Sequence, residues 1–149
     1  MVMSGTRYAL DPRDMVLAKD ARGGGSLQYF NRECKHNFVD KHNKVVGFDS
    51  SECCCENAGW MITAELPKTL EDEQLPDMVW GEAVFAMYEQ PVVNALGKDI
   101  VDEGGSVSFK LITAAQQTMW LTLYNCHNGY YGHGFDVKIE GAIMTEGCL

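Results

Sequence analysis

Three runs of strand-forming residues in the last third of the chain restrict its fold most. Residues 106–113 (SVSFKLIT) and 118–125 (TMWLTLYN) are rich in β-branched and aromatic residues, and the short connection between them predicts a β-hairpin. Residues 135–141 (FDVKIEG) alternate between apolar and polar side chains, which is typical of an antiparallel strand with one face in water. The expected core positions are Phe135, Val137 and Ile139, and the expected solvent positions are Asp136, Lys138 and Glu140. The sequence therefore predicts a C-terminal meander of three antiparallel strands.

Two helices are expected before this sheet. The first begins near Asp11 and Pro12, which suit the cap and the first helical position, and it ends at the glycines of residues 23–25. The second is expected over residues 26–43, with Ser26 as its cap. Its buried stripe at helical spacing would be Leu27, Phe30, Cys34 and Phe38.

Two shorter strands are expected at residues 44–49 and 59–63. With the helices early and the antiparallel strands late, the predicted class is α+β. The chain has 149 residues, of which 46% are hydrophobic, so residues 1–149 are expected to form a single domain with its own core.

The net charge is −9, which argues against direct binding to nucleic acid. The charge is uneven, because residues 65–103 carry ten acidic residues and two lysines. This segment is either a solvated acidic face or a surface that suits a basic partner protein.

The sequence predicts a cytoplasmic protein that does not enter a membrane. The N-terminus lacks a basic region followed by an apolar run, and no apolar run approaches the length of a membrane span. Cytoplasmic thiols stay reduced. Of the six cysteines, three are consecutive, and adjacent cysteines do not bond each other without strain, so a disulfide framework is not expected.

The consecutive cysteines lie in the segment Glu52-Cys53-Cys54-Cys55-Glu56. In an extended chain Cys53 and Cys55 would share one side, and zinc prefers four cysteine and histidine ligands. The candidate zinc ligands are Cys53, Cys55, Cys126 and His127, with His133 as a further choice. Two other interpretations stay open, namely that the cysteines are small buried hydrophobes, or that Cys54 or Cys55 is a nucleophile activated by a histidine.

A second unusual segment is residues 125–135 (NCHNGYYGHGF). Asn128-Gly129 is a strong turn signal, because both residues tolerate positive φ. Glycines allow a ligand to approach the backbone closely, and Tyr130 and Tyr131 supply stacking surface. The alternative is a wide turn whose tyrosines pack against the sheet.

Together these motifs resemble a family of small, uncharacterised phage and bacterial proteins. Its members carry an acidic-Cys-Cys-Glu motif, here within Glu52–Glu56, and an Asn-Gly-Tyr-Tyr motif, here Asn128–Tyr131. The resemblance covers residues 44–63 and 105–140, and the third cysteine, His127 and His133 depart from the pattern. It implies a phage or bacterial source and no particular mechanism.

We expect the two segments to meet in one corner, formed by residues 52–60 and 125–135. The predicted function is a small intracellular binding protein, either a phage-encoded inhibitor of a host protein or a protein that sequesters a small ligand. The alternative is a zinc-dependent or cysteine-dependent enzyme that uses Cys53–Cys55 with His127 or His133. The predicted binding residues are Glu56, Asn57, Trp60, His127, Asn128, Tyr130, Tyr131 and His133.

Overall fold

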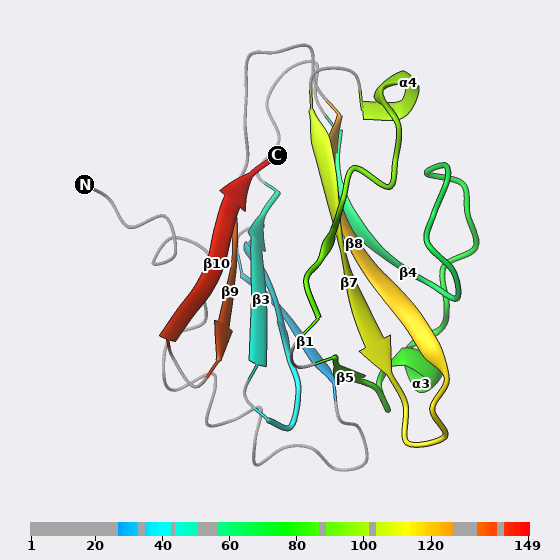
Figure 1. The fold of residues 1–149 in the computed structure, drawn as a ribbon, viewed down its shortest axis with the longest axis vertical. Helices are drawn as coiled ribbons and strands as arrows, with labels where there is room; N and C mark the ends of the chain where they lie inside the picture. The colour runs from blue at the N-terminus through cyan, green and yellow to red at the C-terminus, as the bar shows by residue number, and fades with distance from the viewer. Residues whose placement is uncertain are drawn as a thin grey trace.

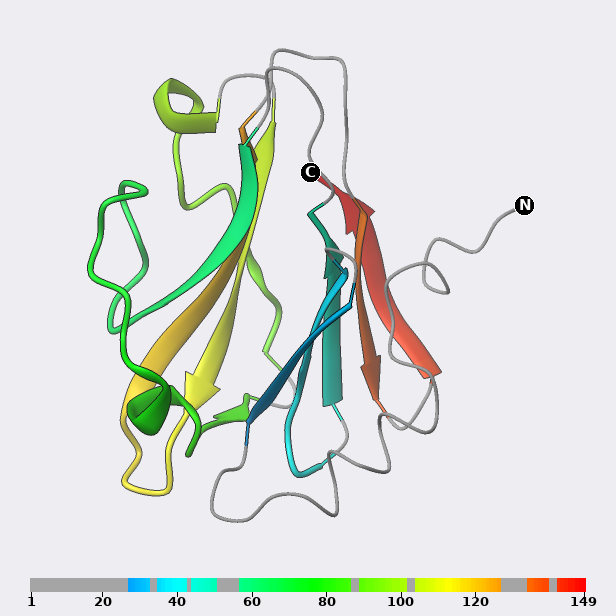
Figure 2. The ribbon, with the colours of Figure 1, turned by 180° about the vertical axis from the view of Figure 1, so that it is seen from behind.

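The structure is a computed structural model in which two antiparallel β-sheets face each other (Figures 1 and 2). It describes residues 27–32, 35–42, 44–50, 57–86, 89–101, 104–126, 134–139 and 142–149.

Sheet A has the strand order β1-β2-β3-β9-β10, and every neighbouring pair is antiparallel. Its strands are β1 (Gln28–Arg32), β2 (Lys35–Val39), β3 (Lys44–Asp49), β9 (Gly134–Ile139) and β10 (Ala142–Cys148). The sheet therefore combines an N-terminal group of three strands with the two last strands of the chain.

Sheet B is built from the part of the sequence that lies between β3 and β9. Its order is β4-β8-β7-β5, and β6 also pairs with β7. Its strands are β4 (Asn57–Thr63), β5 (Val84–Phe85), β6 (Val92–Val93), β7 (Gly105–Ile112) and β8 (Thr118–Cys126). Two single-turn helices, α3 (Asp77–Trp80) and α4 (Lys98–Val101), lie in its connections.

The main core fills the space between the sheets. Sheet A contributes Phe38, Val46 and Phe48, and sheet B contributes apolar side chains from alternate positions of its strands. Those alternate positions include Ile62, Phe109, Leu111, Leu121 and Leu123. The opposite face of sheet A is also buried at several positions, because Val39 and Val45 form a second apolar cluster with Phe30 packed against it.

The α+β prediction is wrong, because the described chain is an antiparallel β-sandwich. Residues 26–43 were expected to form a helix, yet β1 and β2 form a hairpin there, in which Gln28 pairs with Val39 and Arg32 with Lys35. Sheet A buries side chains on both faces of β2 and β3, so these strands lack the clean alternation that marks a strand in a sequence. The apolar residues consequently matched a helical spacing by coincidence. The first predicted helix and Cys34 lie outside the described residues.

The predicted hairpin of the C-terminal third is confirmed, because β7 and β8 pair from Gly105↔Asn125 to Ile112↔Thr118. The three-stranded meander is wrong, because β9 leaves this sheet and pairs with β3 and β10. Asp136 was expected to face the solvent, yet it is 0% exposed. The strands predicted at 44–49 and 59–63 are confirmed as β3 and β4.

No helix in the described ranges is both long and apolar enough to span a membrane.

Candidate functional site

Two connections link the same pair of sheets, and each begins and ends next to the other. Residues 51–56 link β3 to β4, and residues 127–133 link β8 to β9. Their attachment points are neighbours in both sheets, because Asn57 pairs with Cys126 in sheet B and Phe48 pairs with Phe135 in sheet A. We call the end of the sandwich marked by Ser50, Asn57, Cys126 and Gly134 the crossover end.

A hydrogen bond also joins the sheets at this end. The buried side chain of Asn125, on β8, donates through Nδ2 to the backbone oxygen of Leu149, which directly follows β10 (3.1 Å). The attachment points of the two unusual segments are therefore held in place by strand pairing and by this link.

The two described cysteines lie at the crossover end, and the other four are close in sequence to residues of that end. Cys126 ends β8, and Cys148 pairs with Gly134 at the start of β9. Cys34 directly precedes Lys35, which pairs with Asp49 at the end of β3. The remaining three belong to the connection 51–56, and they are Cys53, Cys54 and Cys55.

Cys126 and Cys148 are free cysteines, the first half-buried and the second exposed. Burial raises the pKa of the Cys126 thiol, so it is protonated at neutral pH. Within the described ranges no three metal-binding side chains cluster. The other predicted zinc ligands, Cys53, Cys55, His127 and His133, lie outside those ranges.

Of the predicted binding residues, the structure describes Asn57 and Trp60. The others lie outside the described residues, and they are Glu56, His127, Asn128, Tyr130, Tyr131 and His133. Asn57 begins β4 opposite Cys126. The half-buried Trp60 ring meets Phe38 edge-on at 5.0 Å and lies 4.9 Å from the ring of Tyr29. Trp60 therefore belongs to the aromatic part of the core beneath the corner, and its contact with a ligand stays a prediction.

A chain of three hydrogen-bonded polar side chains, the half-buried Tyr29 and the buried His36 and Ser50, also approaches the crossover end. The Tyr29 hydroxyl lies 2.6 Å from Nδ1 of His36, and Nε2 of His36 lies 2.5 Å from Oγ of Ser50. His36 and Ser50 are each 8% exposed. Burial lowers the pKa of His36, an effect that the nearby charge of Asp49 opposes, so the imidazole is neutral at pH 7.

The registers of sheet A explain why these three side chains meet. Tyr29 pairs with Phe38 and His36 pairs with Phe48, so Tyr29 and His36 share the face that carries the main core. Ser50 lies two residues beyond Phe48 and shares that face. The sequence analysis did not predict this arrangement, because it assigned residues 26–43 to a helix. A period-two interpretation, with Tyr29, His36 and Phe38 on one face of a hairpin, would have found it.

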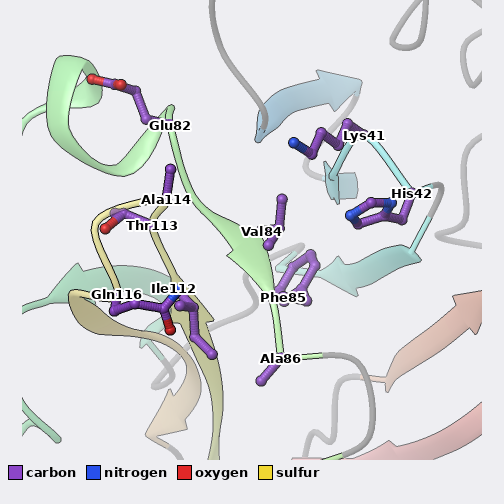
Figure 3. Close-up of a pocket in the computed structure, with 10 residues that line it drawn as sticks. All are labelled: Lys41, His42, Glu82, Val84, Phe85, Ala86, Ile112, Thr113, Ala114 and Gln116. Atoms are coloured by element: carbon purple, nitrogen blue, oxygen red, sulfur yellow. The ribbon is translucent and has the colours of Figure 1, made fainter.

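A separate open pocket of about 570 Å³ lies at the opposite end of the sandwich (Figure 3). Its walls come from β5, from the β7–β8 turn and from the turn after β2, which supplies Lys41 and His42. Beside it, the buried Asp40 carboxylate accepts the backbone N–H groups of His42, Lys44 and Phe85 at 2.9, 3.0 and 3.1 Å. None of the residues predicted for the binding corner lines this pocket.

The geometry therefore defines a two-sheet antiparallel β-sandwich in which two described cysteines, Cys126 and Cys148, lie at the crossover end. No family model, no curated protein and no solved structure matches the chain. The resemblance to a phage and bacterial family stays a prediction.

Proposed function

We propose that this is a binding protein that uses the crossover end, and that it holds a thiophilic metal ion there, with zinc as the first choice. One observation carries the proposal, namely that strand pairing brings Cys126 and Cys148 to the end of the sandwich to which the segments with the other four cysteines connect. Two of the four histidines, His127 and His133, belong to the connection that joins β8 to β9 at this end. Thiolate and imidazole are the ligands that zinc prefers.

The number of residues between each candidate ligand and the nearest described strand residue limits the distance between their Cα atoms. Consecutive Cα atoms are about 3.8 Å apart, so the Cα of His127 lies within about 4 Å of the Cα of Cys126. The same limit holds for His133 and Gly134. Cys55 is two residues from Asn57, so their Cα atoms are at most about 7.6 Å apart. Because Asn57 and Cys126 pair, candidates from both connections are available to one tetrahedral site.

The metal proposal predicts about one equivalent of zinc in protein purified without a histidine tag from zinc-supplemented cells. Replacing Cys53 and Cys55 together by serine, or His127 by alanine, is expected to reduce the zinc content at least tenfold. The matched control is His42→Ala, because His42 lies in the turn at the opposite end and is expected to leave the content unchanged. Elemental analysis measures the metal, and circular dichroism checks that each variant folds.

Thiol reactivity supplies a second readout. Zinc added to the apo protein is expected to protect two or more thiols from a chromogenic disulfide reagent in the native state. Less than a tenth of an equivalent of zinc after purification, together with no protection on zinc addition, would overturn the metal proposal.

The partner prediction concerns the same end of the molecule. A phage-encoded inhibitor would present the crossover end, with Tyr130 and Tyr131, to a host protein in the cytoplasm. Loops at one end of a sandwich are a common place for recognition, which supports this assignment. The alternative of a zinc-dependent or cysteine-dependent enzyme requires an open metal position or a thiolate, and the raised pKa of Cys126 speaks against that residue as the thiolate.

A further inference from the structure

We propose that Ser50 is a nucleophile for acyl transfer, with His36 as its general base and Tyr29 as the positioning residue of the histidine. The geometry that carries the proposal is the continuous chain from Tyr29 Oη through both nitrogens of His36 to Ser50 Oγ, at 2.6 and 2.5 Å. A nucleophile within hydrogen-bond reach of a base, itself oriented by a third group, is the general arrangement for covalent catalysis by serine. This inference does not depend on zinc binding.

The two hydrogen bonds of His36 can supply the tautomer that catalysis needs. When Nδ1–H donates to the phenol oxygen of Tyr29, Nε2 has a free lone pair and accepts the Ser50 hydroxyl proton. The rings of Tyr29 and His36 are stacked, with centroids 5.8 Å apart and planes 12° apart, and this stacking holds the imidazole in the required orientation.

The hydrogen-bonded chain Tyr29–His36–Ser50, called the relay below, lies near the crossover end of the sandwich, and its base and nucleophile are each 8% exposed. Ser50 directly follows β3, whose last residue is Asp49, at the point where the chain leaves sheet A. On the inner side, the Phe48 ring stacks with the His36 ring, with centroids 6.5 Å apart, and covers that face of the imidazole. The neutral state of His36 at pH 7 leaves it able to accept a proton.

The proposed reaction is the hydrolysis of an activated ester or thioester. Ser50 Oγ forms a bond to the carbonyl carbon while its proton moves to Nε2 of His36. The carbon–oxygen or carbon–sulfur bond then breaks, and the leaving alcohol or thiol takes that proton. Water, deprotonated by His36, attacks the acyl-serine, and its addition releases the acid and returns the proton to Ser50.

A fluorophosphonate probe tests the nucleophile directly in the full-length protein. We expect the probe to label Ser50, as located by peptide mass spectrometry, and Ser50→Ala to abolish the labelling. The matched control is Ser108, a buried serine whose hydroxyl is hydrogen-bonded to Thr122 Oγ1 at 2.7 Å, so it is expected to stay unlabelled. Hydrolysis of p-nitrophenyl acetate is expected to fall in Ser50→Ala by on the order of 10²-fold.

The role of the relay is tested separately from the fold. Tyr29→Phe keeps the ring but removes the hydroxyl, and it is expected to slow labelling about tenfold and to change its pH profile while the melting temperature stays nearly constant. In the unchanged protein, the labelling rate is expected to fall on acidification with a midpoint below 6.5, the ordinary pKa of histidine. A chelator is expected to have no effect, which separates this result from the zinc experiment. Absence of labelling at Ser50 in folded protein, or equal labelling of Ser50 and Ser108, would overturn the proposal.

Discussion

Replacing Asp40 with alanine is expected to lower the free energy of unfolding by about 3–5 kcal/mol. The Asp40 side chain is 2% exposed, and its carboxylate accepts three backbone N–H groups. One belongs to His42 in the turn between β2 and β3, one to Lys44 at the start of β3, and the third to Phe85 of sheet B. Removal of the carboxylate leaves buried donors without their partner, and each such donor carries a desolvation cost of about 1–3 kcal/mol.

Urea denaturation followed by far-ultraviolet circular dichroism measures this loss. The matched control is Asp72→Ala, because the Asp72 carboxylate also accepts a backbone N–H, from Lys68 at 2.7 Å, but in an exposed turn. Its loss is expected to be much smaller, since water replaces the carboxylate as the acceptor. Equal losses in the two variants would show that Asp40 does not stabilise the contact between the sheets.

Replacing Asp136 with asparagine is expected to raise the free energy of unfolding at pH 8 by about 1–3 kcal/mol. Asp136 is 0% exposed, and within the described structure neither carboxylate oxygen has a hydrogen-bond partner. Burial raises the pKa of Asp136 to about 7; Lys138 opposes this rise, and Glu146 adds to it. The neutral amide of asparagine has the same shape and avoids the cost of the buried charge. Burial of its N–H groups without acceptors offsets part of this gain.

The pH dependence of the unchanged protein follows from the same carboxyl group. Between pH 4 and 7 the folded state holds a proton that the unfolded state has released, so stability falls as the pH rises. The change is about 1.4 kcal/mol per pH unit at most, which gives roughly 2–3 kcal/mol between pH 5 and pH 8. Above pH 7 the contribution levels off, because the carboxyl group is then ionised in both states.

Urea denaturation at several pH values tests this expectation. Asp136→Asn is expected to flatten the decline between pH 5 and pH 8. The control Glu73→Gln makes the same change in net charge at an exposed position, and it is expected to preserve the decline. A decline that persists unchanged in Asp136→Asn would assign it to other groups.

The sequence predicted local strands better than it predicted their partners. The β7–β8 hairpin was accessible because its two strands are adjacent in the chain and are joined by a short turn. The pairing partner of β9 could not be predicted from the sequence. That partner depends on whether the chain after β8 turns back to pair with β8 or continues into the other sheet. No local pattern decides this choice, which depends on packing between residues far apart in the sequence.

Burial on both faces of sheet A explains the other errors. The hairpin of β1 and β2 lacks a wet face, so Phe30 and Phe38, which lie on opposite faces, were assigned to one helical stripe. Asp136 was assigned to solvent because residues 135–141 alternate between apolar and polar side chains, a pattern typical of a strand with one face in water. The sequence analysis missed the Tyr29–His36–Ser50 relay because it assigned the residues of β1 and β2 to a helix.

The two unusual segments were expected to meet in one corner. The strand pairings at their ends agree with this expectation. Pairing of Asn57 with Cys126 and of Phe48 with Phe135 attaches both segments at neighbouring points. The sequence indicated this because residues 44–63 contain strand-forming runs that could join the C-terminal strands. Contacts among residues 52–56 and 127–133 stay a prediction.

The insertion of sheet B between β3 and β9 affects how the chain is made. A ribosome completes β3 and then the whole of sheet B before it synthesises the β9 residues that pair with β3. Until then, the nascent chain carries a β3 edge with unpaired backbone groups next to Val45, Val46 and Phe48, the kind of edge that recruits other chains. We therefore expect the yield of native protein to depend on translation speed and on chaperones that shield this edge.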